Sequence, residues 1–181
     1  MTTRPPLIGL TGLNGAGKGE AAKHLMTLGY AYYSLSDILR EELAARGEPA
    51  SRDDLIRVGN ELRARYGPDV LALRTLRKLR PGGRAVIDSI RNSREVAALR
   101  RQPGFVLVAI EAPAEVRFAR VQARGRNESA VTLEEFLAKE NEERRGGDAA
   151  QQLDACLALA DIRIENTGTL EELHRRLEEA L

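Results

Sequence analysis

The feature that most constrains the fold of this chain is a glycine-rich segment that follows a short apolar run. Leu7-Ile-Gly-Leu10 precedes Gly12-Leu-Asn-Gly-Ala-Gly-Lys18-Gly19, and a helical pattern begins at Lys18. Glycines let successive backbone N–H groups converge on one anion, and the N-terminus of the helix adds the positive end of its dipole. The segment therefore predicts a phosphate-binding loop in which Lys18 reaches the outer phosphates. The residues expected to bind the nucleotide here are Asn14, Gly15, Ala16, Gly17, Lys18, Gly19 and Glu20.

Composition limits the class of protein that carries this loop. The chain has 181 residues, of which 43% are hydrophobic and 30% charged, and its net charge is +1. These values are typical of one globular domain spanning 1–181 and indicate neither a nucleic-acid nor a membrane partner. The longest apolar run, Phe105 to Ile110, is too short to span a membrane, and the N-terminus lacks a signal-peptide core. We expect a soluble cytoplasmic protein, and no pattern specifies an oligomeric state.

Short apolar runs alternate with longer helical patterns, which is typical of a parallel sheet covered by helices. The predicted strands are Leu7–Leu10, Tyr30–Tyr33, Ala85–Asp88, Phe105–Glu111 and Asp161–Ile164. The predicted helices are 18–28, 36–46, 51–65, 70–79, 93–101, 113–124, 132–143, 149–160 and a terminal helix capped at Thr169. The single cysteine, Cys156, is expected in the core. Together with the loop, this order predicts a three-layer α/β fold of the P-loop type, with a five-stranded parallel sheet.

Two regions interrupt the alternation of strands and helices. Residues 36–80 form an all-helical insert between the second and third strands, and residues 124–148 are rich in arginine and glutamate and flanked by glycine. By analogy with other phosphate-loop folds, the insert would bind an acceptor and 124–148 would form a lid that excludes water.

Several charged residues are candidates for phosphate chemistry. Asp88 ends an apolar strand, where it would hold Mg²⁺ or cap the following turn, and Arg91 would bind a ligand or form a surface ion pair. Arg117, Arg120 and Arg124 lie on one face of a predicted helix. They could form a solvated stripe, or a clamp that stabilises the charge of a phosphoryl group during transfer. Because Arg120 and Arg124 lie at the edge of the glycine-flanked segment 124–148, we favour the clamp for these two residues. Ser36, Asp37 and Arg40 form a further candidate group. They lie at the start of the helix after the second strand, and Ser36 or Asp37 would cap that helix.

These residues together resemble the nucleoside monophosphate kinases, and adenylate kinase in particular. That family also carries Gly-Lys-Gly in its loop. The residue that follows is threonine in the family and Glu20 here, and we expect the Glu20 side chain to point away from the phosphates or to contact Mg²⁺ through water. The resemblance implies that Arg40, in Ser36-Asp37-Ile-Leu-Arg40, holds the phosphate of the acceptor. It also matches Asp88 and Arg91 to the family's third-strand acid and arginine, and Arg120 and Arg124 to its arginines beside the lid.

A closer resemblance covers nearly the whole chain. Gly59-Asn-Glu-Leu-Arg63, Ile87-Asp-Ser-Ile-Arg91 and Asn166-Thr-Gly-Thr-Leu-Glu-Glu are similar to a group of small, mostly archaeal kinases described as adenylate-kinase-like or dephospho-coenzyme A kinase-like. The segment 160–168 is also similar to dephospho-coenzyme A kinase, which implies that Asn166 lies near the adenine. That enzyme carries two acids where this chain has Ser34 and Ser36.

The residues and the resemblance predict an ATP-dependent, Mg²⁺-assisted phosphotransferase whose acceptor is a small-molecule nucleotide, in the form of a monophosphate or deoxymonophosphate. Two alternatives stay open from sequence: a hydroxyl kinase of the dephospho-coenzyme A type, in which Asp37 would be the base, and an ATPase switch that acts on a protein partner.

Overall fold

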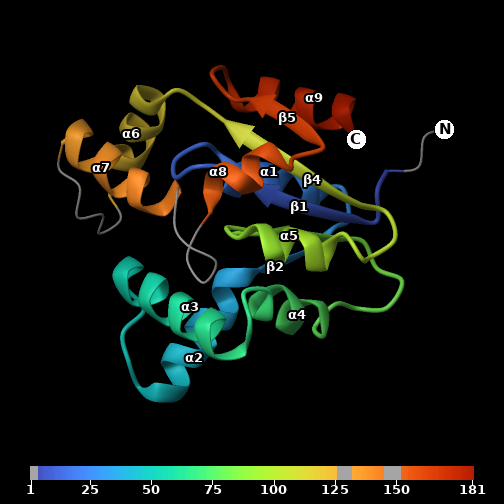
Figure 1. The fold of residues 1–181 in the computed structure, drawn as a ribbon. Helices are drawn as coiled ribbons and strands as arrows, with labels where there is room; N and C mark the ends of the chain where they lie inside the picture. The colour runs from blue at the N-terminus through green and yellow to red at the C-terminus, as the bar shows by residue number, and fades with distance from the viewer. Residues whose placement is uncertain (1–3, 126–131, 145–151) are drawn as a thin grey trace.

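Five parallel strands form one sheet at the centre of the molecule (Figure 1). The computed structural model describes residues 4–125, 132–144 and 152–181. The strands are β1 (Leu7–Thr11), β2 (Ala31–Ser34), β3 (Ala85–Asp88), β4 (Phe105–Glu111) and β5 (Ile162–Glu165), in the spatial order β2-β3-β1-β4-β5. β1 therefore pairs with β3 on one side and β4 on the other. The predicted three-layer α/β fold with five parallel strands is confirmed.

Side chains of alternate strand residues point to opposite faces of the sheet, so each face has its own core. Ile8 and Leu10 belong to the cluster under α1 (Lys18–Thr27) and α9 (Leu170–Ala180). Leu7 belongs to the cluster under α5 (Ser93–Leu99) and α8 (Leu153–Ala158), which lie in front of the strands in Figure 1. Cys156 is buried in this second cluster, as predicted. The strands at the centre are apolar on both faces, as parallel sheets require.

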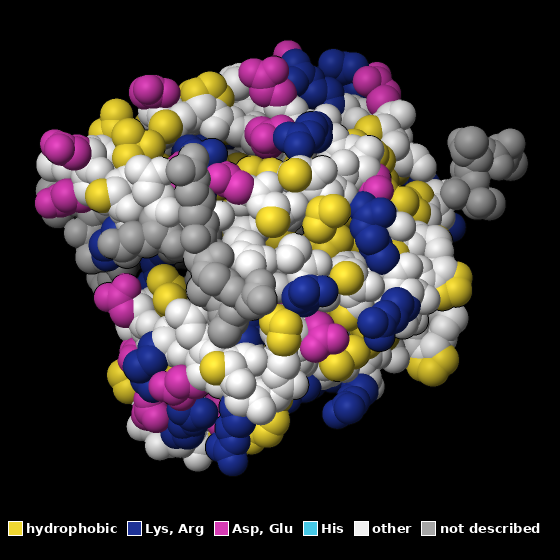
Figure 2. Space-filling view, in the orientation of Figure 1, with side chains coloured by type: hydrophobic (Ala, Val, Ile, Leu, Met, Phe, Trp, Pro, Cys, Tyr) yellow, Lys and Arg dark blue, Asp and Glu magenta, His cyan; other side chains and the backbone are white. Residues whose placement is uncertain are grey.

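The segment between β2 and β3 is helical, as expected. It contains α2 (Leu35–Arg46), α3 (Arg52–Tyr66) and α4 (Val70–Leu76), which lie below the sheet in Figure 1. Their apolar faces join the cluster of α5 and α8. Acidic and basic side chains are intermixed over α2 and α3 on the face drawn in Figure 2. Among the ion pairs of these helices, Arg46 pairs with Glu42 and Glu61. The predicted cap of α2 is wrong: Ser34, the last residue of β2, accepts the hydrogen bond from the Ser36 N–H, because the helix starts one residue early.

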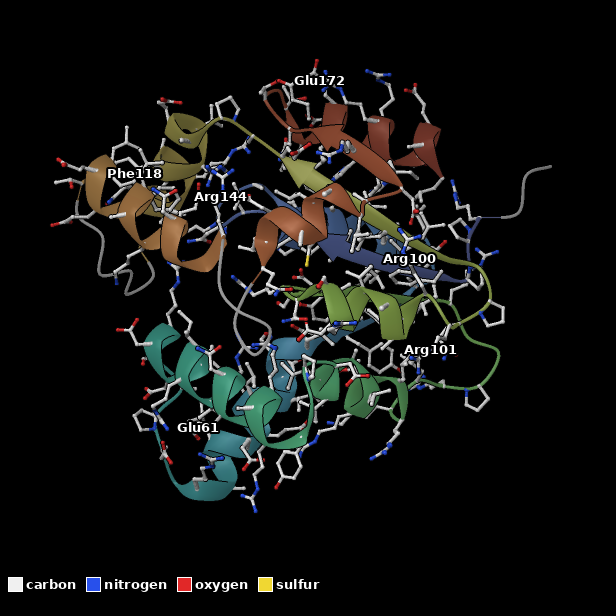
Figure 3. All side chains as sticks on the ribbon, viewed as in Figure 1. Glu61, Arg100, Arg101, Phe118, Arg144 and Glu172 are labelled. Carbon is white, nitrogen blue, oxygen red and sulfur yellow. The ribbon has the colours of Figure 1, made fainter. Side chains whose placement is uncertain are left out.

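The remaining helices, α6 (Ala114–Ala123) and α7 (Leu133–Arg144), follow β4. α6 packs against α7 through the rings of Phe118 and Phe136, whose centroids lie 5.6 Å apart. α7 contacts α8 through an ion pair between Arg144, labelled in Figure 3, and Asp154. The predicted capping box opens α7, since the Glu135 N–H donates to Thr132 Oγ1. Of the expected lid, 124–148, residues 126–131 and 145–148 lie outside the described residues.

A few element boundaries differ from the prediction. β2 starts one residue late because the Tyr30 N–H still donates to the Leu25 carbonyl at the end of α1. β5 also starts one residue late, since the Asp161 carboxylate accepts from the Leu107 N–H and ends the preceding turn. α4 stops at Leu76, and turn hydrogen bonds replace its expected last three residues. α8 begins at Leu153, while the start predicted for it, residue 149, lies outside the described residues. Within the described ranges, no helix is long and apolar enough to cross a membrane.

Candidate active site

The loop between β1 and α1 is shaped so that three of its positions, Gly12, Gly15 and Gly17, accept only glycine. Gly15 and Gly17 have φ angles of +78° and +108°. A Cβ at Gly15 would lie 2.5 Å from the carbonyl oxygen of Arg117, and a Cβ at Gly17 would lie 2.2 Å from Nδ2 of Asn166. Gly17 caps α1 without a side-chain hydrogen bond from any described residue, so the positive end of the helix dipole faces the cleft beside the loop. This is the arrangement that binds phosphate at a helix N-terminus.

Lys18 and Asn166 each bind backbone carbonyl oxygens of the loop. The Lys18 ammonium donates to the carbonyl oxygens of Gly12 and Leu13, at 2.7 and 3.1 Å, so its charge is held over the loop. Asn166 is buried, and its Nδ2 donates to the carbonyl oxygen of Ala16 at 2.8 Å. Asn166 therefore fixes the backbone of the loop, and it is not among the residues that line the cleft beside the loop.

A cleft of about 410 Å³, here called the phosphate cleft, opens beside the loop. It brings together ten of the predicted site residues, from the loop, α2, the end of β3 and the end of α6: Asn14, Gly15, Gly17, Lys18, Gly19, Ser36, Arg40, Asp88, Arg91 and Arg124. Its wall also contains Ala22, Lys23, Met26, Tyr32 and Ser89. The cleft lies at the carboxyl edge of the parallel strands, which is where ligands bind in open α/β sheets.

Four other predicted residues, besides Asn166, do not line this cleft. Ala16 is buried, and its N–H donates to the Leu13 carbonyl. Glu20 pairs with Lys23 at 2.8 Å, and the exposed Asp37 pairs with Arg40 at 2.8 Å. Arg120 lies on α6, and its buried Nη1 has no hydrogen-bond partner in the described residues. A buried cationic donor without an acceptor is costly, so an anion bound beside α6 would satisfy it.

Asp88 is the acid of the phosphate cleft. It is 8% exposed, its Oδ1 accepts from the Ser89 N–H at 2.6 Å, and its Oδ2 accepts from the Tyr32 hydroxyl at 3.4 Å. Burial, followed by the charge of Asp88, raises the pKa of Tyr32 to about 12, so this hydroxyl stays a donor. The described residues contain no group of three or more acidic, histidine or cysteine ligands. One carboxylate beside a phosphate loop fits Mg²⁺, which is usually held by one or two carboxylates together with substrate phosphates.

Three serine hydroxyls meet where β2 and β3 end. Ser34 Oγ lies 2.8 Å from Ser36 Oγ and donates to Ser89 Oγ at 3.1 Å, and Arg40 Nη1 donates to Ser36 Oγ at 2.9 Å. Ser89 has a φ of +64°, an uncommon value for a residue with a side chain. Sequence reasoning missed Ser89 and Tyr32. Ser89 directly follows the predicted Asp88, whereas Tyr32 reaches the site through the pairing of β2 with β3, which the local sequence does not encode.

A second, smaller pocket of about 70 Å³, here called the side pocket, adjoins the phosphate cleft. The two share Ser36, Ser89 and Arg91. Most of the side pocket is apolar, with the side chains of Leu35, Leu39, Leu55, Ile56 and Leu71 in its wall. Its other residues are Arg52 and Arg63, and the buried Arg63 donates through Nε and Nη2 to Oε1 of Glu95, at 3.0 and 2.8 Å.

Arg117 does not belong to a solvated stripe or to a phosphate clamp. Its guanidinium is buried, donates to the carbonyl oxygen of Asn14 at 3.2 Å and pairs with Glu140 on α7. Its spacing from Arg120 and Arg124 shows the shared helix face, but no local signal indicates Glu140 as its partner.

The parallel sheet, the glycine loop after its central strand and the arginine-lined cleft define a small P-loop protein of the kinase-like class. Solved structures share this fold. Shikimate kinase from Bacteroides thetaiotaomicron superposes with a TM-score of 0.62 at 16% identity, over 96% of both chains. TT1252 from Thermus thermophilus superposes with a TM-score of 0.61 at 27% identity, over 98% of this chain and 96% of that chain.

Sequence comparison gives the family. The profile of a family described as an AAA domain matches residues 8–148. A UPF0200 protein from Pyrococcus horikoshii is 34% identical over 182 residues, which cover 97% of this chain and 95% of that protein. A UPF0200/UPF0201 protein from Archaeoglobus fulgidus is also 34% identical over 187 residues, but the match spans only 56% of its length. The chain belongs to the UPF0200 family of AAA-domain proteins, and the resemblance to archaeal P-loop kinase-like proteins is confirmed.

Proposed function

We propose that this protein transfers the γ-phosphoryl group of ATP to a nucleotide, in the form of a nucleoside monophosphate or deoxymonophosphate. The observation that carries the proposal is the wall that the phosphate cleft and the side pocket share, formed by Ser36, Ser89 and Arg91. A molecule with a flat aromatic ring at one end and a phosphate at the other fits this pair of pockets. Its ring would occupy the side pocket, and its phosphate would lie over the shared wall, facing the loop of Lys18.

The charges around the cleft suit a phosphate acceptor. A monophosphate already presents an ionised oxygen, so its transfer needs positioning and charge neutralisation but no general base. In this proposal Lys18 and the loop backbone bind the outer phosphates of ATP, Arg40 and Arg91 bind the acceptor phosphate, and Arg120 and Arg124 stabilise the transferring charge. Asp88 would hold Mg²⁺, which when bound neutralises charge on the phosphate oxygens.

The competing hydroxyl-kinase reading needs a carboxylate near the acceptor hydroxyl. At the end of β2 this chain places Ser34 and Ser36, whose hydroxyls bind each other and Ser89. Asp37, the residue that would be the base in that alternative, is exposed and paired with Arg40. Asp88, the acid of the cleft, is the residue proposed above to hold Mg²⁺. These contacts favour a phosphate acceptor over a hydroxyl acceptor.

The test is ADP formation from Mg-ATP, measured with a panel of ribo- and deoxyribonucleoside monophosphates and with dephospho-coenzyme A. We expect one or more monophosphates to stimulate turnover and Lys18→Ala to abolish it. Arg40→Ala should remove the stimulation and leave basal ATP hydrolysis nearly intact. Arg46→Ala is the matched control, since Arg46 lies on the same helix in an ion pair away from the cleft.

The other results have definite meanings. Stimulation by dephospho-coenzyme A alone would overturn the acceptor assignment and make Asp37 the candidate base. Binding of ATP without stimulation by any small acceptor would favour a switch that acts on a partner.

A further inference from the structure

The buried hydroxyl of Ser34, at the end of β2, uses its whole hydrogen-bonding capacity within the protein. Its oxygen accepts the Ser36 N–H at 3.3 Å, lies 2.8 Å from Ser36 Oγ and donates to Ser89 Oγ at 3.1 Å. A hydroxyl has one proton to donate and two lone pairs that accept. Because the proton of Ser34 goes to Ser89, the proton in the contact between Ser34 and Ser36 comes from Ser36.

Arg40 fixes the direction of this set of hydrogen bonds, here called the serine network. A guanidinium donates and cannot accept, so the bond of 2.9 Å between Arg40 Nη1 and Ser36 Oγ uses a lone pair of Ser36. The proton of Ser36 is therefore available for Ser34, and that of Ser34 goes on to Ser89. Each member of the network donates to the next, and Ser89 is its last member.

Ser89 consequently keeps its own proton for a ligand. Among the described residues, the remaining hydrogen-bond contact of its hydroxyl is with Ser36 Oγ at 3.5 Å, which is longer than an ordinary O–H···O bond. Ser89 lines both the phosphate cleft and the side pocket. A ligand that extends from one pocket into the other therefore lies beside a hydroxyl that can still donate.

The backbone at Ser89 has a conformation that disfavours a side chain. Its φ of +64° lies in the left-handed region, which glycine adopts without steric cost and other residues adopt rarely. Glycine would form this turn more easily, so the turn alone does not account for a serine. Residues held in such conformations cluster at ligand sites, where the side chain has a use that offsets the strain.

We propose that the Ser89 hydroxyl donates a hydrogen bond to the phosphate of the acceptor. The assignment rests on the proposed function, because it takes the ligand that spans the two pockets to be a monophosphate. The acceptor phosphate is favoured over those of ATP, since the loop residues Gly15, Gly17 and Lys18 line only the phosphate cleft, whereas Ser89 also lines the side pocket. An ionised phosphate oxygen accepts such a hydrogen bond more strongly than a neutral oxygen does.

Two substitutions that both delete the hydroxyl test the proposal, because they affect the backbone differently. Ser89→Gly relieves the strain of the positive φ and Ser89→Ala retains it, so the glycine variant should unfold at the higher temperature of the two. With a monophosphate that stimulates ADP formation, we expect the KM of the acceptor to rise about tenfold in both variants, the loss typical of one hydrogen bond to a charged group. The KM for ATP should be unchanged.

Thr169→Ala is the control, since it removes a hydroxyl that caps α9 outside both pockets. It should lower stability without changing either KM. An acceptor KM that stays at the wild-type value in either Ser89 variant, or that follows their order of stability, would overturn the assignment and leave the proposed function standing. A rise in the KM for ATP alone would also overturn it, by placing the hydroxyl at the phosphates of ATP. If no monophosphate stimulates the wild-type protein, the proposed function fails, and this assignment fails with it.

Discussion

Arg117 on α6 donates through Nη2 to Oε1 of Glu140 on α7 at 3.0 Å, and the two residues are only 3% and 5% exposed. The other terminal nitrogen of the same guanidinium donates to the carbonyl oxygen of Asn14 in the phosphate loop. The Phe136 ring lies beneath the guanidinium carbon at 5.5 Å from its centroid. One buried cation therefore links α7 to the loop that receives the phosphates, and Arg117 is a positioning residue for that loop.

Replacing Glu140 with glutamine should damage both stability and nucleotide binding. The change keeps the shape of the side chain but leaves the Arg117 charge buried without a counter-ion, which typically costs about 3–5 kcal/mol. Urea unfolding should show this loss, and the Kd for ADP should rise, since the guanidinium that holds Asn14 loses its anchor. Glu134→Gln, at an exposed position of the same helix, is the control. An unchanged Kd in a destabilised Glu140→Gln protein would mean that the ion pair stabilises the fold without positioning the loop.

Gly19 should tolerate serine, in contrast to Gly17. A Cβ at Gly19 meets no atom within 4 Å, whereas one at Gly17 would collide with Asn166. Serine forms helix more readily than glycine, so Gly19→Ser should raise the free energy of unfolding by about 0.5 kcal/mol. Its hydroxyl would occupy the position that holds Mg²⁺ in most phosphate loops, and half-maximal activity should then require less Mg²⁺. Gly17→Ser should instead lower both stability and nucleotide affinity, and a tolerant Gly17→Ser protein would contradict the glycine requirement.

Tyr32 should ionise late in a pH titration. Its pKa is raised from 10.0 to about 12, first by burial and then by the Asp88 carboxylate. The folded protein thus holds this proton more tightly than the unfolded chain, so the contribution of Tyr32 to stability is complete below pH 10 and is lost between pH 10 and about 12. The difference in phenolate absorbance between the wild-type protein and the Tyr32→Phe variant should follow a single titration near pH 12. A titration of that difference near pH 10 would mean that neither burial nor the Asp88 carboxylate raises the pKa of this hydroxyl.

The thiol of Cys156 should react only when the fold opens. Burial, and secondarily the charge of Glu95, raises the pKa of this thiol to about 12, so neither access nor thiolate is available at neutral pH. A disulfide reagent should label the native protein at the rate of local or global unfolding and label the urea-unfolded chain at once. Labelling as fast as a free thiol under native conditions would mean that α8 does not cover this residue.

The phosphate loop and the order of the elements were predictable because their signals are local. Gly15, Gly17 and Lys18 are adjacent in sequence, and capping residues such as Ser51, Thr132 and Thr169 lie within three residues of the N–H groups they bind. The alternation of apolar runs likewise located all five strands to within one residue.

The partners within the site were not predictable, because they join distant parts of the chain. Arg63 and Glu95 are 32 residues apart, and Arg117 and Glu140 are 23 apart. Each arginine alone has the pattern of a solvated helix residue, and only the folded chain shows that it is buried against a carboxylate. The contact of Asn166 with the Ala16 carbonyl, 150 residues away, is a further long-range partner of this kind.

The order of the strands separates two parts of the proposed site. The loop of Lys18 grows from β1, which is enclosed between β3 and β4, whereas α2, α3 and α4 leave from β2 at the outer edge of the sheet. Changes in the length or sequence of those helices therefore affect the edge strand β2 more than the central strands of the sheet. If the proposed function holds, the helices at the edge can therefore change to suit a different acceptor while the phosphate loop and the central strands stay as they are.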